Sequence, residues 1–391
     1  MTLAQAAPTR RTDPLVVFFC IALVAVFAAG ALNIALVTPF PAPIDELEHY
    51  SFMRALASAP TLFPHYGTYR VLSTDLSHWT DRINYIAHPP LYYLLLAPTP
   101  ADIATLRFIN VAIATLGVAF SAAAVARLAP SRVSALVSVV LVTAFARTIA
   151  TGGLINNDNL VVLETGAVFF VLSGQKDRPG ALALLLALTG WTKLNGFVAL
   201  ALIVGALHLV EIVRGRAGLF SRRSFILVAG VLAGFVPTIG NLVTIHAAVY
   251  APADFLFVPE AARRQFDGFW SFADFFVHRL GQKFPPVEGS FDATPLLAAI
   301  LGVAIAGLFA ERDRLRDMNA AFLVALAAFF AIHLVYGWRS YVAFGSISDA
   351  QMRYYNALWP FIAFACATGL DAMIAALRKS RPPAGLSEKA P

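Results

Sequence analysis

Four ionisable residues lie within five positions of one another near the N-terminus. Asp45, Glu46, Glu48 and His49 follow two prolines in the stretch PAPIDELEHY. The prolines end one element, and Asp45 is then well placed to cap a new helix that carries the other three in its first turns. On such a helix Asp45 shares a face with Glu48 and His49, so a carboxylate and an imidazole can act on one proton or one metal ion.

Acidic residues also favour a helix N-terminus by themselves, which explains one or two carboxylates but not the histidine. Crowded carboxylates beside a low-dielectric region should raise one another's pKa, as is typical of a general base. We therefore favour a catalytic function for this cluster.

A second motif is AHPPLYYLLL, residues 87–96. Its rigid di-proline turn places His88 at the outer mouth of the next hydrophobic segment. The same pattern is also typical of the start of a membrane span with an interfacial tyrosine pair, Tyr92 and Tyr93. Both interpretations stay open for this motif.

Two further polar groups interrupt apolar sequence. The turn NNDN, residues 156–159, places Asp158 at the start of a helix, at the same depth as Asp45, although four small polar residues also form a turn and a cap by themselves. Lys193 lies between apolar segments of roughly 34 residues in total, too long for one span and short for two. This length predicts a broken helix or a tight hairpin, where the lysine either snorkels or holds a phosphate.

Two arginines occupy a short segment before the last apolar run, in WRSY and QMRYY. Arg339 and Arg353 lie on the predicted outer side, against the usual charge trend, and so need another reason to be there. They can bind a lipid headgroup nonspecifically or clamp a phosphate through bidentate hydrogen bonds.

The elements that hold these residues are predicted to be membrane helices. Of 391 residues, 59% are apolar and 13% charged, and the mean hydropathy is +0.71. This composition excludes a soluble globule, for which about 25% charged residues is usual. Apolar runs predict an all-α polytopic membrane protein with about ten transmembrane helices, near residues 14–38, 101–128, 132–152, 158–173, 180–195, 196–213, 223–245, 294–310, 318–337 and 354–377.

Lysines and arginines gather in alternate short connections, which predicts that both termini lie inside the cell. The outer face then receives residues 39–100 and 246–293, long enough to hold interfacial helices, and residues 338–353. We expect one transmembrane domain over residues 1–380 and a disordered tail over 381–391. The net charge of +6 therefore reflects topology and not nucleic-acid binding. Cys20 and Cys366 lie in apolar runs and are expected to be buried packing residues.

Together these motifs resemble the GT-C membrane glycosyltransferases. The resemblance includes an Asp-Glu pair and a histidine after the first span, His-Pro-Pro-Leu-Tyr-Tyr, a polar turn with aspartate, a lysine at a helix break, and Arg353-Tyr354 before the last span. The nearest branch comprises bacterial relatives of protein mannosyltransferases and lipid A sugar transferases. Glu48 before His49, and His88 where glutamine is common, depart from the pattern.

The resemblance implies transfer of a hexose or pentose from a polyprenyl-phosphate donor to an acceptor hydroxyl on the outer face, in the bacterial inner membrane. The acceptor would be a cell-envelope glycan, lipid or protein, with membrane lipid as a further partner. Asp45 is the expected base, with Glu46 beside it. The expected substrate-binding residues are His49, His88, Tyr92, Asp158, Lys193, Arg339, Arg353 and Tyr354, with Lys193 and Arg353 at the leaving phosphate.

If the site uses a divalent metal ion, the expected ligands are Asp45, Glu48 and His49. Two other functions, and a purely structural membrane subunit, remain open. A transporter or flippase for lipid-linked sugars would place ionisable residues within spans, as Arg107, Arg147 and Glu164 do. An O-antigen polymerase or ligase would depend more on outer-loop arginines and a histidine.

Overall fold

The described residues of the computed structural model are 13–43, 45–100, 102–174, 176–246, 258–285, 289–347 and 350–380. Helices dominate these ranges. The strands found there, β1 (Arg70–Leu72) and β2 (Trp79–Ile83), form one antiparallel hairpin. The all-α class predicted from the hydropathy pattern is thus confirmed, while the predicted tail 381–391 lies outside the described residues.

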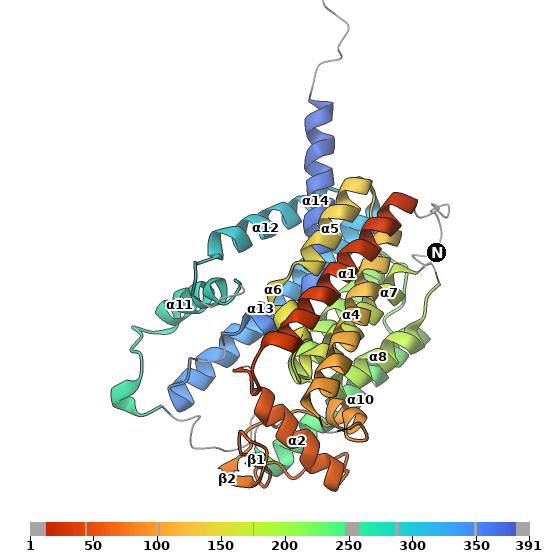
Figure 1. Cartoon of the computed structure of the whole chain (residues 1–391). Coiled ribbons are helices and arrows are strands. Elements are labelled where there is room, and N and C mark those ends of the chain that lie inside the picture. Colours follow the sequence, from red (N-terminus) through yellow and green to blue (C-terminus); the bar gives the residue numbers. More distant parts are fainter. Residues whose placement is uncertain are drawn as a thin grey trace, which may run out of the picture.

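Each of the ten predicted apolar runs contains helix (Figure 1). Among the described residues, six helices are long and apolar enough to cross a membrane, and α5 with α6, bent by 48°, is a candidate for a seventh crossing. Helices α7, α8 and α12 are shorter, so the count of ten spans stays a prediction. The six are α1 (Pro14–Val37), α4 (Ile103–Leu128), α9 (Leu194–Val213), α10 (Arg222–Ile245), α13 (Asp313–Phe344) and α14 (Trp359–Lys379); the others are α5 (Arg132–Thr143), α6 (Ala146–Gly152), α7 (Asp158–Ser173), α8 (Pro179–Thr192) and α12 (Thr294–Ala306) with its 3-10 extension η3 (Gly307–Phe309).

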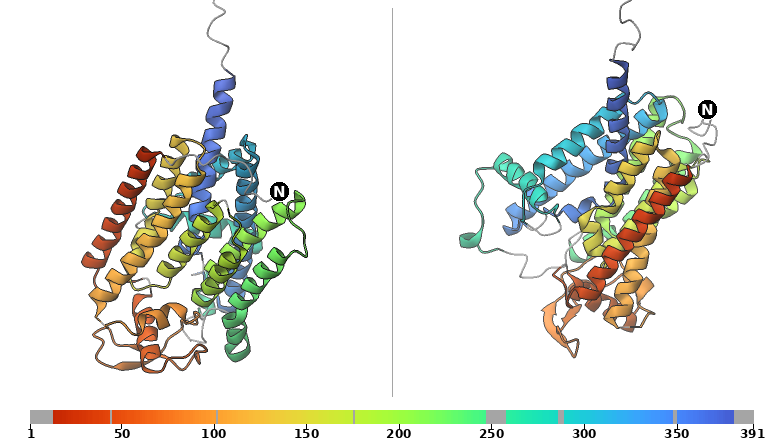
Figure 2. Two further views of the ribbon diagram at one scale, coloured as in Figure 1. Left: turned by 90° about the vertical axis from the view of Figure 1, so that its right-hand side faces the viewer. Right: turned by 45° about the horizontal axis from the view of Figure 1, so that its top comes forward.

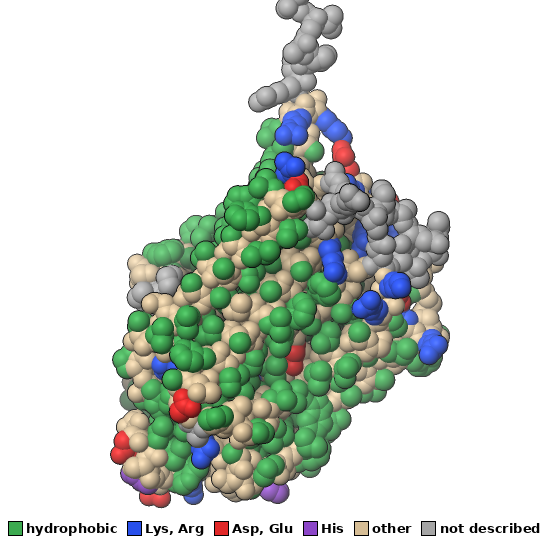
Figure 3. Space-filling view, turned by 45° about the vertical axis from the view of Figure 1, so that its right-hand side comes forward, with side chains coloured by type: hydrophobic (Ala, Val, Ile, Leu, Met, Phe, Trp, Pro, Cys, Tyr) green, Lys and Arg blue, Asp and Glu red, His purple; other side chains and the backbone are tan. Residues whose placement is uncertain are grey.

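The surface agrees with a membrane-embedded bundle. Apolar side chains cover the middle of the face shown in Figure 3, and lysines and arginines gather toward the end where α14 finishes. Cys20 and Cys366 are free and buried, as expected.

Glycines allow close contact between the helices that carry the polar motifs. A Cβ atom on Gly166 of α7 would lie 2.1 Å from the carbonyl oxygen of Gly117 on α4, and one on Gly190 of α8 would lie 2.2 Å from that of Gly234 on α10. No side chain fits at these distances, so the backbones themselves are in contact, as is common between membrane helices. This packing fixes α7, which begins at Asp158, and α8, which ends next to Lys193.

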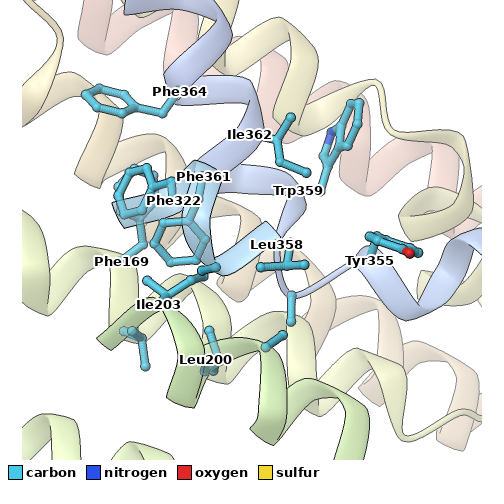
Figure 4. Packing of buried hydrophobic residues seen from close by; sticks show 14 of the residues in the cluster. Phe169, Leu200, Ile203, Phe322, Tyr355, Leu358, Trp359, Phe361, Ile362 and Phe364 are labelled. Carbon is cyan, nitrogen blue, oxygen red and sulfur yellow. The ribbon is translucent and has the colours of Figure 1, made fainter. Parts of the chain in front are cut away.

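The first turns of α14 pack into an aromatic core (Figure 4). Phe361 lies on Phe169 of α7 and on Phe322 of α13, with ring centroids 4.7 and 4.9 Å apart. The 3-10 turn η4 (Met352–Tyr355) directly precedes this core and is partly buried in it. The backbone that carries Arg353 is therefore held in place by this packing.

A smaller assembly lies at one end of the bundle. Helices α2 (Glu46–Ser58) and α3 (Leu91–Leu96) pack with the β1–β2 hairpin around their own apolar core. Figures 1 and 2 show this assembly at the end opposite to that where α1 begins and α14 finishes. An even number of crossings places the start of α1 and the finish of α14 at the same end of the bundle. Which end faces the cytoplasm stays a prediction.

One predicted outer segment differs from expectation, and another contains a helix as expected. Residues 338–344 continue α13 instead of forming a loop, because Trp338 and Tyr341 pack on Phe272. Within 246–293 the structure describes the 3-10 turn η2 (Glu260–Ala262) and a helix, α11 (Phe269–Gln282), while 247–257 and 286–288 lie outside the described residues.

Candidate active site

Asp45 lies immediately before α2, in a left-handed backbone conformation with φ of 58°. Its side chain forms no capping hydrogen bond with the helix, contrary to the prediction. The left-handed turn directs the carboxylate elsewhere: the hydroxyl of Tyr85 donates to Oδ1, and Nη2 of Arg353 donates to Oδ2 over 2.7 Å. Asp45 thus joins residues that follow β2 and residues of η4.

Opposing effects set the ionisation of Asp45. Burial would raise its pKa, but the charge of Arg353, the hydrogen bonds from Tyr85 and Arg353, and the charge of Lys193 together place the pKa below its usual range. The predicted rise is therefore wrong for Asp45. The expected rise in pKa is found for Glu48, where burial raises the pKa although Nη2 of Arg82 lies 2.8 Å from Oε1 of the carboxylate. Asp45 is ionised at neutral pH and can accept a proton.

Glu46 is fully buried, and its role differs from that of Asp45. Its Oε1 accepts hydrogen bonds from Arg107 Nε (2.9 Å) and the Ile155 backbone N–H (3.1 Å), and its Oε2 accepts from Arg107 Nη2 (2.7 Å) and the Ala42 N–H (2.9 Å). Arg107 also donates to two carbonyl oxygens at the end of α1. Glu46 is consequently a positioning residue that ties the Asp45 segment to the loop before Asp158, and the geometry does not support the expected catalytic role.

Two stacked histidines adjoin Asp45. The rings of His49 and His88 have centroids 5.9 Å apart, and Nδ1 of His49 lies 2.8 Å from the hydroxyl of Tyr93. Burial and the positive charges of Lys193 and Arg353 lower the pKa of both histidines well below its usual value. Both rings are neutral at pH 7.

Tyr92 belongs to the core and not to the site. It is buried, and its hydroxyl donates to Asn110 Oδ1 over 2.8 Å. The neighbouring Tyr93 is the tyrosine that reaches His49. Successive residues of α3 face different directions, so the sequence motif alone does not separate them.

Lys193 and Asp158 form a second buried ion pair, with Nζ 2.7 Å from Oδ1. Lys193 has extended backbone between α8 and α9, so the predicted helix break is confirmed. The charge of Lys193 acts on Asp45, and that of Asp158 acts on Arg353. The two acid–base pairs, far apart in sequence, are thus within electrostatic reach of each other.

Asp45 and Arg353 line a cavity of about 300 Å³. Its other polar walls are Arg147 and Thr151 on α6, Lys283 after α11, and Gln351 before η4. The Nε–H of Arg147 donates to the carbonyl oxygen of Lys283, which joins two of these walls. Lys283 and Gln351 were not predicted, and Arg147 was noted only as a charge within a span.

Three of the expected substrate-binding residues, Arg339, Tyr354 and Lys193, do not line the cavity. Arg339 is exposed on α13 and does not line the cavity. Tyr354 lies beside Arg353, whose guanidinium carbon is 5.8 Å from the tyrosine ring centroid. Lys193 does not line the cavity, and its ammonium is bonded to Asp158.

The expected metal ligands do not converge on one point. Asp45 is bonded to Tyr85 and Arg353, while Glu48 is paired with Arg82 and His49 with Tyr93. Throughout the described part of the chain, no three His, Cys, Asp or Glu side chains are arranged to hold a metal ion. The residues present therefore do not fit the metal site that the sequence suggested.

No protein-family model and no curated protein sequence matches this chain. The fold is similar to the crystal structure of ArnT from Cupriavidus metallidurans in the apo state, with a TM-score of 0.55 and 14% identity over 91% of this chain and 60% of that one. The crystal structure of the same protein bound to undecaprenyl phosphate has a TM-score of 0.41 and 14% identity, over 93% of this chain and 78% of that one. This chain thus spans 60% of the length of the apo ArnT structure, and the likeness concerns the fold, which is helical and polytopic as predicted.

Proposed function

We propose that this chain is a GT-C-type glycosyltransferase that moves a sugar from a polyprenyl-phosphate donor to an acceptor hydroxyl at the outer face of the membrane. One observation carries the proposal: an ionised carboxylate, Asp45, and an arginine, Arg353, line one cavity at the end of an apolar helical bundle. Transfer requires a group that takes the acceptor's proton and a group that binds the leaving phosphate.

In the proposed reaction the acceptor oxygen attacks C1 of the sugar. The bond between C1 and the phosphate oxygen breaks, its electron pair leaves with the phosphate, and the hydroxyl proton passes to Asp45. The sugar passes through an oxocarbenium-like transition state with inversion at C1, by analogy with glycoside hydrolysis.

Arg353, Arg147 and Lys283 are the proposed phosphate ligands. Guanidinium and ammonium groups donate charge-assisted hydrogen bonds to phosphate oxygens. These cations supersede the expected use of Lys193 as a direct ligand, because its ammonium is bonded to Asp158. Lys193 acts instead through its charge and by holding Asp158.

The position of the cavity suits a lipid-linked donor, whose polyprenyl chain must stay in lipid while its phosphate and sugar lie at headgroup level. In this proposal the protein spans the bacterial inner membrane with both termini in the cytoplasm and the cavity on the outer face. The acceptor is a cell-envelope glycan, lipid or protein.

The experiment uses the purified chain in liposomes with a radiolabelled polyprenyl-phosphate sugar and a cell-envelope extract as the source of acceptor. We expect release of polyprenyl phosphate and movement of the label into the extract. Transfer of intact donor between leaflets, without release of polyprenyl phosphate, would instead support a transporter.

A further inference from the structure

We propose that Arg353 couples donor binding to catalysis: the donor phosphate withdraws the guanidinium from Asp45 and so frees this carboxylate to take the acceptor's proton. The inference rests on the proposed transferase function and assigns Arg353 a second role, as the residue that controls the base.

Both oxygens of Asp45 accept hydrogen bonds in the structure. Tyr85 donates to Oδ1, and Arg353 donates to Oδ2. A carboxylate held by a charged donor is a weak base, since protonation must overcome that interaction. Oδ2 must therefore lose Arg353 before it can take a proton efficiently, while Tyr85 continues to hold the carboxylate through Oδ1.

Arg353 contacts Asp45 through one nitrogen only. Nη2 makes this bond, whereas Nε and Nη1 are buried and have no hydrogen-bond partner among the described residues. Buried donors without an acceptor are unfavourable, and a guanidinium binds a phosphate best through two parallel hydrogen bonds. Both nitrogens are buried in this conformation, so a phosphate in the cavity reaches them only when the guanidinium turns away from Asp45; it then satisfies donors that Asp45 leaves unused, which gives it an advantage in competing for Arg353.

The charged neighbours of Asp45 determine how its basicity changes when Arg353 moves. Arg353 makes the largest contribution that lowers the pKa of Asp45, and Lys193, itself bonded to Asp158, a smaller one. If Arg353 moves to a phosphate, Asp45 loses its strongest positive neighbour and gains a negative one, so its pKa rises. The other ionisable groups facing this region are Tyr85 after β2, Glu48 and His49 on α2, His88 before α3, Tyr354 on η4, and Arg147 and Lys283 across the cavity.

The test compares two pH profiles of the purified wild-type protein. The acid limb of kcat/KM for the donor reports Asp45 before the donor binds, and the acid limb of kcat reports Asp45 in the donor complex. We expect the acid limb of kcat to lie about one pH unit or more above that of kcat/KM, because Asp45 has lost Arg353 in the donor complex. A shift of one unit corresponds to a tenfold change in proton affinity. The phosphodiester of the donor does not titrate in this range.

Arg353→Gln removes the charge that the donor is proposed to withdraw. We expect its two acid limbs to lie closer together than those of the wild-type protein, since only the charge of the phosphate then still separates them, with a raised KM for the donor. Arg222→Gln, at the exposed arginine that begins α10, is the matched control and should keep the wild-type separation.

Coincident limbs in the wild-type protein would overturn the coupling even while transfer persists, and this result requires no variant to fold. Isotope-edited infrared spectroscopy gives a second measurement without turnover, with undecaprenyl phosphate as the probe. We expect the Asp45 carboxylate band to shift on addition of the probe, and an unchanged band at saturating probe would contradict the inference. Absence of transfer by the wild-type protein would instead refute the proposed function.

Discussion

Asp45 and Glu46 are neighbours in sequence but have different surroundings. The carboxylate of Asp45 reaches the cavity, whereas that of Glu46 is engaged by four hydrogen bonds within the scaffold. The sequence predicts that this cluster is functional, but it cannot separate the two residues. Their difference depends on the left-handed backbone of Asp45, which the pattern of residue types did not reveal.

The buried pair of Glu46 and Arg107 predicts a large effect on stability. We expect Glu46→Gln to lower the free energy of unfolding by about 3–5 kcal/mol, because it leaves the charge of Arg107 buried without a counter-charge. Unfolding in detergent measures this loss. Glu311→Gln, in the exposed pair with Lys379, is the control and should change stability little. Similar small losses of unfolding free energy in both variants would contradict the structural role of the buried Glu46–Arg107 pair.

The stacked histidines predict weaker stability in acid. Their pKa values are lowered in the folded state, whereas an unfolded histidine titrates near pH 6.5. Below about that pH the unfolded state binds more protons, so the free energy of unfolding falls as the pH decreases; above it their protonation costs no stability. Unfolding measured between about pH 7.5 and pH 5 should show a smaller slope in His88→Gln but not in His65→Gln, an exposed control. An equal slope in all three proteins would contradict this.

At the scale of elements, apolar runs predicted the helices well, and the break at Lys193 was predicted from segment length. The cavity was harder to predict, because Arg147, Lys283 and Gln351 come from α6, the end of α11 and the segment before η4. Nothing in their local spacing indicates that they meet. The extension of α13 beyond residue 337 likewise depends on aromatic packing against α11.

Helix contact at Gly166 is expected to be essential for placing α7. In Gly166→Ala the new methyl group meets the backbone of α4, so we expect a loss of about 1–3 kcal/mol in stability and reduced transfer. Gly205→Ala on α9, where no atom lies within 4 Å of the added group, should be neutral or stabilising. Thermal unfolding and transfer assays on both variants check this, and equal stability of the two would show that α4 and α7 tolerate separation.

At the scale of the molecule, composition and the distribution of basic residues predicted a polytopic bundle with its functional residues collected at one end. The structure has Asp45, Asp158, Lys193 and Arg353 within electrostatic reach of one another. Which sugar and acceptor the protein uses depends on the shape of the cavity and on contacts that residue types alone do not encode.

The proposed orientation can be tested by labelling single cysteines with a membrane-impermeant maleimide. Asp81→Cys lies on the exposed hairpin, and Glu311→Cys lies next to the end of α14. We expect intact cells to label only the first, and lysed cells both, since the native cysteines are buried. Labelling of only the second in intact cells would reverse the topology.

The role of Asp45 as the base that takes the acceptor's proton is tested by measuring donor binding and transfer together on Asp45→Asn. The amide keeps the size of the side chain but cannot serve as the base. We expect donor affinity equal to or greater than that of the wild-type protein, because Arg353 is released, and transfer slower by about 10²–10⁴-fold. Asp81→Asn, at an exposed aspartate of the hairpin, should match the wild-type protein in both. Transfer by Asp45→Asn at the wild-type rate would contradict the account.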